Sequence, residues 1–331
     1  MRNKKIIFTL YTLFIMLFIS GCKNDNYHIK SSELPTVNVN IFRYEDDLMN
    51  IRGENFSSEI INLSDTYSVF LGNLHEDTTG IYLIHNFVED STIQKIYEKT
   101  TAVFDNSDDI SNQFEKSFSH IKFYYQDFMT PDIFTYISGF DYSSPVIYTG
   151  DKIIIAIDMY LGADYIPYYE LGIPRYIISK FDKNYLVRDC IEDIAIEKNA
   201  SSNAYTNLIN LMIYYGKNLE FIKRMMPDVN DTIVTGYTAE QLQWCKKHEK
   251  DLWNYLISDD LLFSNDLQLI KKLVDEAPFT SIISHDAPGA VCRWIGWKIV
   301  ASYCKNNNVT VEELMQTTDA MQILNKSGYR P

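Results

Sequence analysis

The chain has 331 residues and a formal net charge of −14 at neutral pH, with 46% hydrophobic and 22% charged residues. This composition excludes wholesale disorder and gives enough length for one large domain or for two lobes that share a core. A chain this acidic repels phosphate backbones, which argues against nucleic acid as a partner.

The first 21 residues have the parts of a bacterial signal peptide. Arg2, Lys4 and Lys5 form a basic start, and an apolar stretch of about 14 residues follows at 6–19. As a helix this stretch is roughly 21 Å long, too short for the roughly 30 Å hydrocarbon core of a bilayer. We therefore expect residues 1–21 to be removed as a signal peptide; without their three positive charges the net charge is −17.

The end of this signal resembles the lipobox of bacterial lipoproteins. Ile19, Ser20 and Gly21 stand before Cys22: a branched aliphatic residue, then two small ones. A transferase must reach the thiol and a peptidase must cleave between Gly21 and Cys22, so bulk here would block both. We therefore expect Cys22 to be acylated. Several acyl chains on one residue anchor a protein stably, whereas a single chain gives only marginal membrane binding. The alternative is an ordinary secretory signal with a chance cysteine.

Residues 22–36 are expected to form the lipid-anchored cysteine and a polar tether that ends near Pro35. Lys23 follows the cysteine where an aspartate would indicate retention in the inner membrane, which favours the outer membrane. The body is then predicted as a single domain over 37–331, with a sheet-containing lobe to about residue 165 and a helical lobe over 166–331.

The β-rich part of the chain is expected between about residues 120 and 158. An alternating segment at 37–42 indicates a short strand before it, and a mostly helical stretch separates the two. Within the β-rich part, Gly150-Asp151 is a tight hairpin signal, and the apolar run at 153–157 indicates a strand covered on both faces. We predict a small, mostly antiparallel sheet packed with helices. The β-rich runs begin at His120, Ile133, Pro145 and Lys152.

The rest of the chain is predicted to be helical. Apolar residues keep a helical period over 208–226. Thr238 and Thr310 each have a glutamine or glutamate three residues later, the pattern of a capping box. Pro288 is expected to start a helix that contains two tryptophans. The fold class is therefore α+β and predominantly α-helical.

Four cysteines besides Cys22 are expected to be buried free thiols. Cys292 and Cys304 share a predicted helix, but roughly 18 Å of helix would separate them, too far for a disulfide. Pairings that involve Cys190 or Cys245 stay open.

The sequence contains none of the usual motifs for a metal or a reaction. The six histidines include no two that are four residues apart, as the zinc helix of a metallopeptidase requires. A glycine-rich phosphate loop and a nucleophile elbow are also missing, and the acidic segment that begins at Asp228 lacks the glycine and glutamate of a calcium loop. We therefore predict no metal, no cofactor and no catalytic residue.

One predicted helix, residues 185–198, carries a group of acids. Asp189, Glu192 and Asp193 lie on its polar side, and Arg188 is placed four residues before Glu192 as an ion-pair partner. Three carboxylates within five residues could serve acid–base or metal chemistry. The alternative is a solvated acidic face.

Several segments together resemble a known family, the gliding-motility lipoprotein GldB. The likeness spans most of residues 37–331 in the same order, and it includes the lipoprotein signal. At the start of the helix after Pro288 the chain departs from the family, with Ala290, Val291 and Cys292 where polar residues and glycine are more usual. The segments that carry the likeness are residues 120–162, Tyr214-Tyr215-Gly216-Lys217, Gly236-Tyr237-Thr238, Glu240-Gln241-Leu242 with Trp244, and Pro288 with 294–300.

The resemblance implies a cell-envelope lipoprotein that is required for gliding and is connected with the machinery that moves adhesins. By analogy of layout it also implies a degenerate zincin-like scaffold, in which residues 189–193 fall near the place of the metal-binding helix but lack its histidines. We therefore expect a non-enzymatic component that contacts other envelope or motility-machinery proteins. The alternatives are a metal-dependent hydrolase that uses Asp189, Glu192 or Asp193, and a surface lipoprotein that binds glycans or nutrients.

Overall fold

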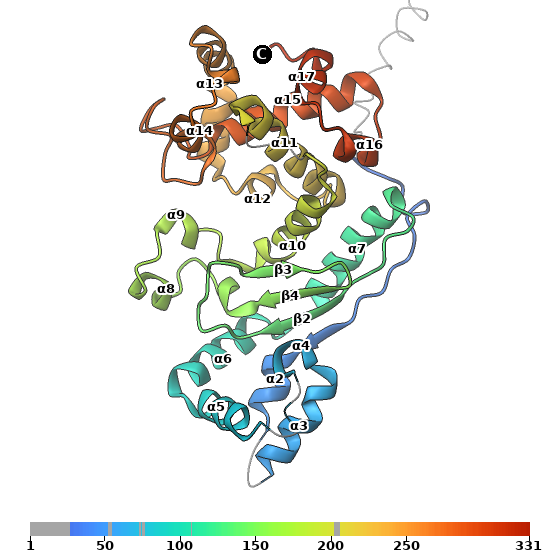
Figure 1. The fold of residues 1–331 in the computed structure, drawn as a ribbon, viewed down its shortest axis with the longest axis vertical. Helices are drawn as coiled ribbons and strands as arrows, with labels where there is room; N and C mark the ends of the chain where they lie inside the picture. The colour runs from blue at the N-terminus through green and yellow to red at the C-terminus, as the bar shows by residue number, and fades with distance from the viewer. Residues whose placement is uncertain (1–26, 52–54, 73, 75–76, 107, 202–205) are drawn as a thin grey trace, which may run out of the picture.

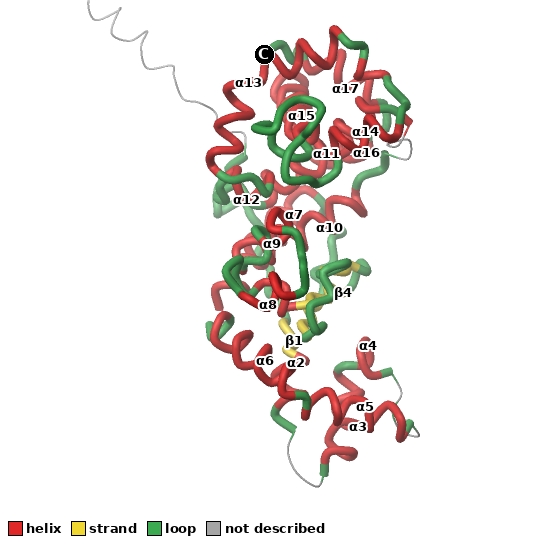
Figure 2. The backbone as a smooth tube through the Cα atoms, turned by 90° about the vertical axis from the view of Figure 1, so that its left-hand side faces the viewer, coloured by secondary structure: helices red, strands yellow, loops and turns green. Residues whose placement is uncertain are grey.

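The computed structural model describes residues 27–51, 55–72, 74, 77–106, 108–201 and 206–331. Within them, 16 helices and four strands confirm the predicted α+β fold in which helices dominate. Both views show three tiers along the long axis: N-terminal helices at one end, the sheet in the middle and C-terminal helices at the other end (Figures 1 and 2). The helices of the first tier are α2 (Tyr44–Met49), α3 (Phe56–Thr66), α4 (Ser68–Leu71), α5 (Thr78–Glu89) and α6 (Ser91–Val103).

The middle tier is a four-stranded sheet of order β1-β2-β4-β3, formed by β1 (Ile41–Arg43), β2 (Asp132–Tyr136), β3 (Val146–Tyr148) and β4 (Lys152–Ala156). The hairpin at Gly150-Asp151 is confirmed, because β3 and β4 pair antiparallel on either side of it. The prediction of a mostly antiparallel sheet was wrong: β1 pairs parallel with β2, and β2 pairs parallel with β4. A long helical crossover separates β1 from β2, and it returns the chain to the same end of the sheet, which parallel pairing requires.

The predicted strand that begins at His120 is also corrected. These residues end helix α7 (Asp108–Tyr124), which packs against α10 and α11. Phe114, Phe118 and Ile121 are fully buried, and their spacing of four and three residues is that of a helix face. The helical period that begins before His120 therefore overrides the β-rich composition after it.

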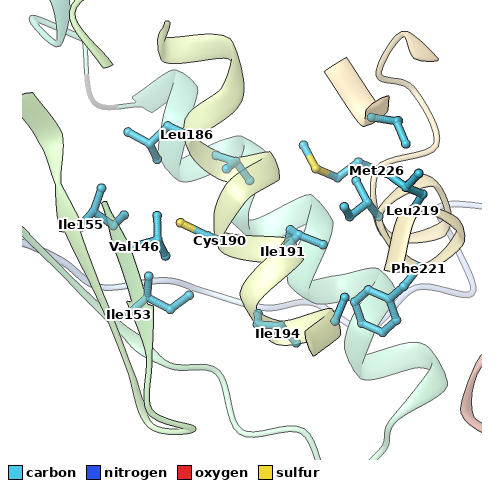
Figure 3. Close-up of a cluster of buried hydrophobic side chains, with 14 of the residues drawn as sticks. Val146, Ile153, Ile155, Leu186, Cys190, Ile191, Ile194, Leu219, Phe221 and Met226 are labelled. Atoms are coloured by element: carbon cyan, nitrogen blue, oxygen red, sulfur yellow. The ribbon is translucent and has the colours of Figure 1, made fainter. Parts of the chain in front are cut away.

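Helix α10 (Lys183–Lys198) is the central packing element of the molecule. Cys190 and Leu186 face Ile153 and Ile155 of the sheet, whereas Ile191 points to the opposite side, toward Leu219 and Phe221 of the C-terminal tier (Figure 3). Its apolar residues from Leu186 to Ala195 are buried, so the helix is covered on two sides. Two short helices lie before it beside the sheet, α8 (Ile166–Glu170) and α9 (Arg175–Ile178).

The C-terminal tier is built around α11 (Leu208–Met225) and α15 (Val291–Asn307). These helices cross at two glycines, where a Cβ atom on Gly296 would lie 1.8 Å from the carbonyl oxygen of Met212. Both predicted capping boxes are present, at Thr238 and Thr310. Among the described residues no helix is both long and apolar enough to cross a bilayer. The other helices of this tier are α12 (Asp231–Thr235), α13 (Ala239–Ser258), α14 (Leu267–Val274), α16 (Val311–Gln316) and α17 (Ala320–Ser327).

The N-terminal segment lies along the body before it enters the sheet. The hydroxyl of Tyr27 donates to the buried carboxylate of Glu220 at 3.0 Å, and the indole N–H of Trp297 donates to the same oxygen at 3.0 Å. Arg224 pairs with the other oxygen of Glu220 at 2.8 Å. The segment then runs from the C-terminal tier down to β1 (Figure 1). It therefore connects the C-terminal tier with the sheet.

Candidate functional site

A cleft of about 300 Å³ lies between the sheet side of the molecule and the C-terminal tier. One wall is formed by α9 and α10, and the other by α11, the turn from α12 into α13 and the start of α15. The cleft therefore collects side chains from parts of the chain that are up to about 120 residues apart, between Arg175 and Trp294. A concave site between two packed units is the usual place for ligand binding.

The predicted acidic group on α10 is divided between this cleft and the sheet. Glu192 lines the cleft, as does its neighbour Arg188. Asp189 instead accepts a hydrogen bond of 3.0 Å from the hydroxyl of Tyr160, which follows β4. Asp193 lies toward β3, where the backbone of Tyr148 contacts it.

Arg188 holds two of the three acids in place. Its guanidinium pairs with Asp189 at 2.9 Å and with Glu192 one helical turn away, as the spacing predicts. Its remaining nitrogens donate to the carbonyl oxygen of Val234 at 3.1 and 3.3 Å. The two acids are only about a quarter exposed, so they belong to a half-buried ion-pair network that joins α10 to the C-terminal tier.

The two aspartates have perturbed acidities. Burial raises the pKa of Asp189, and the Arg188 guanidinium opposes that shift. Burial and the neighbouring Glu192 raise the pKa of Asp193 to about 6. Within the described residues, no group of three acidic, histidine or cysteine side chains is placed to hold a metal ion.

A second ion-pair network links the two walls of the cleft. Glu276 accepts from the ammonium of Lys180 at 2.5 Å and lies 3.7 Å from the guanidinium of Arg293. Although desolvation opposes it, these two cations lower the pKa of Glu276. Arg293 also donates to the carbonyl of Val274 at 2.5 Å and stacks on Tyr215, with its central carbon 3.9 Å from the ring centroid. Arg293 is thus fixed by both polar and aromatic contacts.

The backbone of the cleft wall is shaped by tight contacts. Gly236 ends α12 in the left-handed conformation (φ 71°), and a Cβ atom there would lie 2.9 Å from Lys180. The hydroxyl of Tyr237 donates to the carbonyl of Gly289 at 2.7 Å. The helix after Pro288 begins only at Val291, because Ala290 adopts a left-handed conformation (φ 57°) as its N-cap. That conformation suits glycine better than alanine.

Arg175 is the one cleft arginine with an unused guanidinium. It is the first residue of α9 and is exposed. Its guanidinium makes no hydrogen bond or ion pair with any residue in the described part of the chain. The N–H donors of this guanidinium are therefore available for hydrogen bonds with a ligand in the cleft.

The cysteines offer no reactive nucleophile. Cys190, Cys245, Cys292 and Cys304 are free and buried, which confirms the prediction for these four residues. Burial raises the pKa of Cys292 to about 12, and a protonated thiol is a poor nucleophile. Cys22, the predicted lipidation site, and Gly21, the residue before the cleavage point, lie outside the described residues.

Most of the cleft was missed by reasoning from the sequence. Glu192 and Arg188 were found because they are neighbours on one helix. Arg175, Lys180 and Arg293 lie in three different elements, and no local spacing connects them. The available signal was the family resemblance, because the segments that carry it supply other residues of the lining: Tyr215, Gly236, Tyr237, Thr238, Gln241 and Trp294.

The model of a family described as gliding motility protein GldB matches residues 24–331, which is nearly the whole chain and includes every residue of the cleft. No curated protein and no solved structure matches this chain.

Proposed function

Since the chain belongs to the gliding motility protein GldB family, we propose that it is an envelope lipoprotein required for gliding that acts without catalysis. It contacts other envelope or motility-machinery proteins. The observation that carries this proposal is the extent of the family match, residues 24–331, which covers both lobes. A protein that acts through contacts needs a shaped surface, and the cleft between the two walls supplies one.

The arrangement of the candidate acids supports a role without catalysis. A general acid or base needs a carboxyl group that can reach a substrate. Asp189 is bound by Tyr160 and Arg188, and Glu192 is bound by Arg188. Both carboxylates are thus held by ion pairs within the protein, and Asp193 lies toward the sheet.

Anchoring by Cys22 is part of the same proposal. The signal ends in small residues before Cys22, and Lys23 follows it, which favours the outer membrane. The membrane is then a partner through the lipid alone, and the net charge of the mature chain keeps its surface away from anionic headgroups.

The proposal is tested in the organism that carries this chain. Deletion of the gene should abolish the spreading of cells on a surface, and re-expression should restore it. Crosslinking in intact cells, followed by identification of the captured proteins, should recover envelope or motility proteins. Normal spreading of the deletion strain would refute the proposal. A full equivalent of zinc in the purified protein, together with peptidase activity, would favour the hydrolase instead.

A further inference from the structure

The cleft has a charge opposite to that of the chain around it. Four cations line it: Arg175, Lys180, Arg188 and Arg293. Only two acids line it, Glu192 and Glu276. The lining residues therefore sum to +2, or to +1 when Asp189 behind Arg188 is counted, in a protein whose formal charge is −14. Low-dielectric walls focus such a local field and draw ligands of opposite sign.

The two acids of the lining, Glu192 and Glu276, do not remove the positive charge that a ligand in the cleft would meet. Glu192 is paired with Arg188, and Glu276 with Lys180 and Arg293. Each carboxylate is thus paired with cations of the lining, and the excess positive charge remains on these cations and on Arg175. Arg175 adds a guanidinium that has no internal partner among the described residues.

The chemistry of the walls favours a carboxylate ligand. A guanidinium presents two parallel donors that match both oxygens of a carboxylate, and such bidentate pairs are stronger than neutral hydrogen bonds. Four tyrosines complete the lining: Tyr176, Tyr185, Tyr215 and Tyr237. They offer rigid flat surfaces on which a peptide backbone can pack at a low cost in entropy.

We propose that this cleft binds an acidic peptide segment of a partner protein, whose carboxylates pair with Arg175 and with the outer faces of Lys180 and Arg293. The proposal rests on the contact function inferred above and names the chemistry of the contact. The volume of about 300 Å³ accommodates a few side chains and not a folded domain. The partner therefore enters as an extended segment.

Binding can be measured with a labelled peptide. The full chain is extracted in mild detergent and titrated against fluorescein-labelled hexaglutamate by anisotropy at low ionic strength, with hexaglutamine as the uncharged comparison. We expect saturable binding of hexaglutamate only. The variant Arg175→Glu should weaken it about tenfold, because one attraction becomes a repulsion. The matched control Arg330→Glu makes the same charge change at an exposed arginine outside the cleft and should leave the affinity within about twofold.

Three results would overturn the proposal: equal binding of hexaglutamine, equal weakening by both variants, or displacement of the peptide by inorganic phosphate as effective as that by unlabelled hexaglutamate. The last result would assign a general anion site. In cells, Arg175→Glu should reach the membrane fraction in normal amount but spread poorly. Normal spreading of this variant beside a non-spreading deletion strain would reject the acidic-segment contact and leave the gliding role intact.

Discussion

Replacement of Arg188 by methionine should destabilise the protein by about 3 kcal/mol. Arg188 is buried, and its guanidinium joins Asp189, Glu192 and the carbonyl of Val234. The variant leaves a buried carbonyl without its donor, at about 1–2 kcal/mol. It also leaves two partly buried carboxylates without their counter-ion, at roughly 1 kcal/mol each because both keep some access to water.

The deficit should also depend on pH, and its sign follows from the charges. Burial already raises the pKa of Asp189, and loss of the cation that opposes this shift raises it further. A carboxyl group whose pKa is higher in the folded than in the unfolded state loses stabilisation as the pH rises through that range. The variant should therefore be closer to the parent protein at pH 5 than at pH 8.

Urea unfolding of Arg188→Met and the parent chain at both pH values measures the two effects. Arg175→Met is the matched control, because that exposed arginine has no partner within the described residues, and it should stay within about 0.5 kcal/mol. Adding Glu192→Gln to Arg188→Met should recover part of the loss. A deficit below about 1 kcal/mol that is the same at both pH values would refute the ion-pair reasoning.

Three further outcomes are expected. Cys22→Ala should move the protein from the membrane fraction to the soluble fraction, as immunoblotting of cell fractions would reveal; a variant that stays with the membrane contradicts acylation at this residue. Burial lowers the pKa of Lys217 from 10.5 to about 7. Between these pH values the unfolded chain binds more protons than the folded protein, so the parent should gain stability relative to Lys217→Met as the pH rises. Urea unfolding at pH 7 and 9 tests this, and a constant difference would exclude it. Gly296→Ala should cost about 1–3 kcal/mol despite better helix propensity, because the new Cβ atom would lie 1.8 Å from the carbonyl oxygen of Met212; a thermal midpoint at or above that of the parent would contradict the close crossing.

Local signals predicted local structure well in this chain. Thr238 and Thr310 cap helices as expected, and the hairpin at Gly150 brings β3 beside β4. These features depend on residues within a few positions of one another. The direction of β1 does not, since its pairing with β2 joins Ile41 to Ile133 across a helical crossover. The sequence pattern of neither strand indicates which distant strand it pairs with, or in which direction.

In the site too, contacts within one helix were predictable, whereas contacts between distant elements were not. The pair of Arg188 with Glu192 follows from one helical turn and was predicted. The contact of Arg188 with Val234, and that of Lys180 with Glu276, joins elements that meet only after the tiers have packed. The acid group on α10 was recognised, but its division between cleft and sheet depends on which face α10 turns to Tyr160, which the residue spacing alone leaves open.

The docked N-terminal segment limits how far the proposed lipid anchor can lie from the body. Tyr27 is fastened at Glu220, and five residues of chain can reach at most about 18 Å. Under the proposed anchoring at Cys22, the lipid would lie within this distance of the C-terminal tier. The proposed anchor is therefore at the end of the molecule that carries the C-terminal tier, and the N-terminal helices lie at the opposite end (Figure 1).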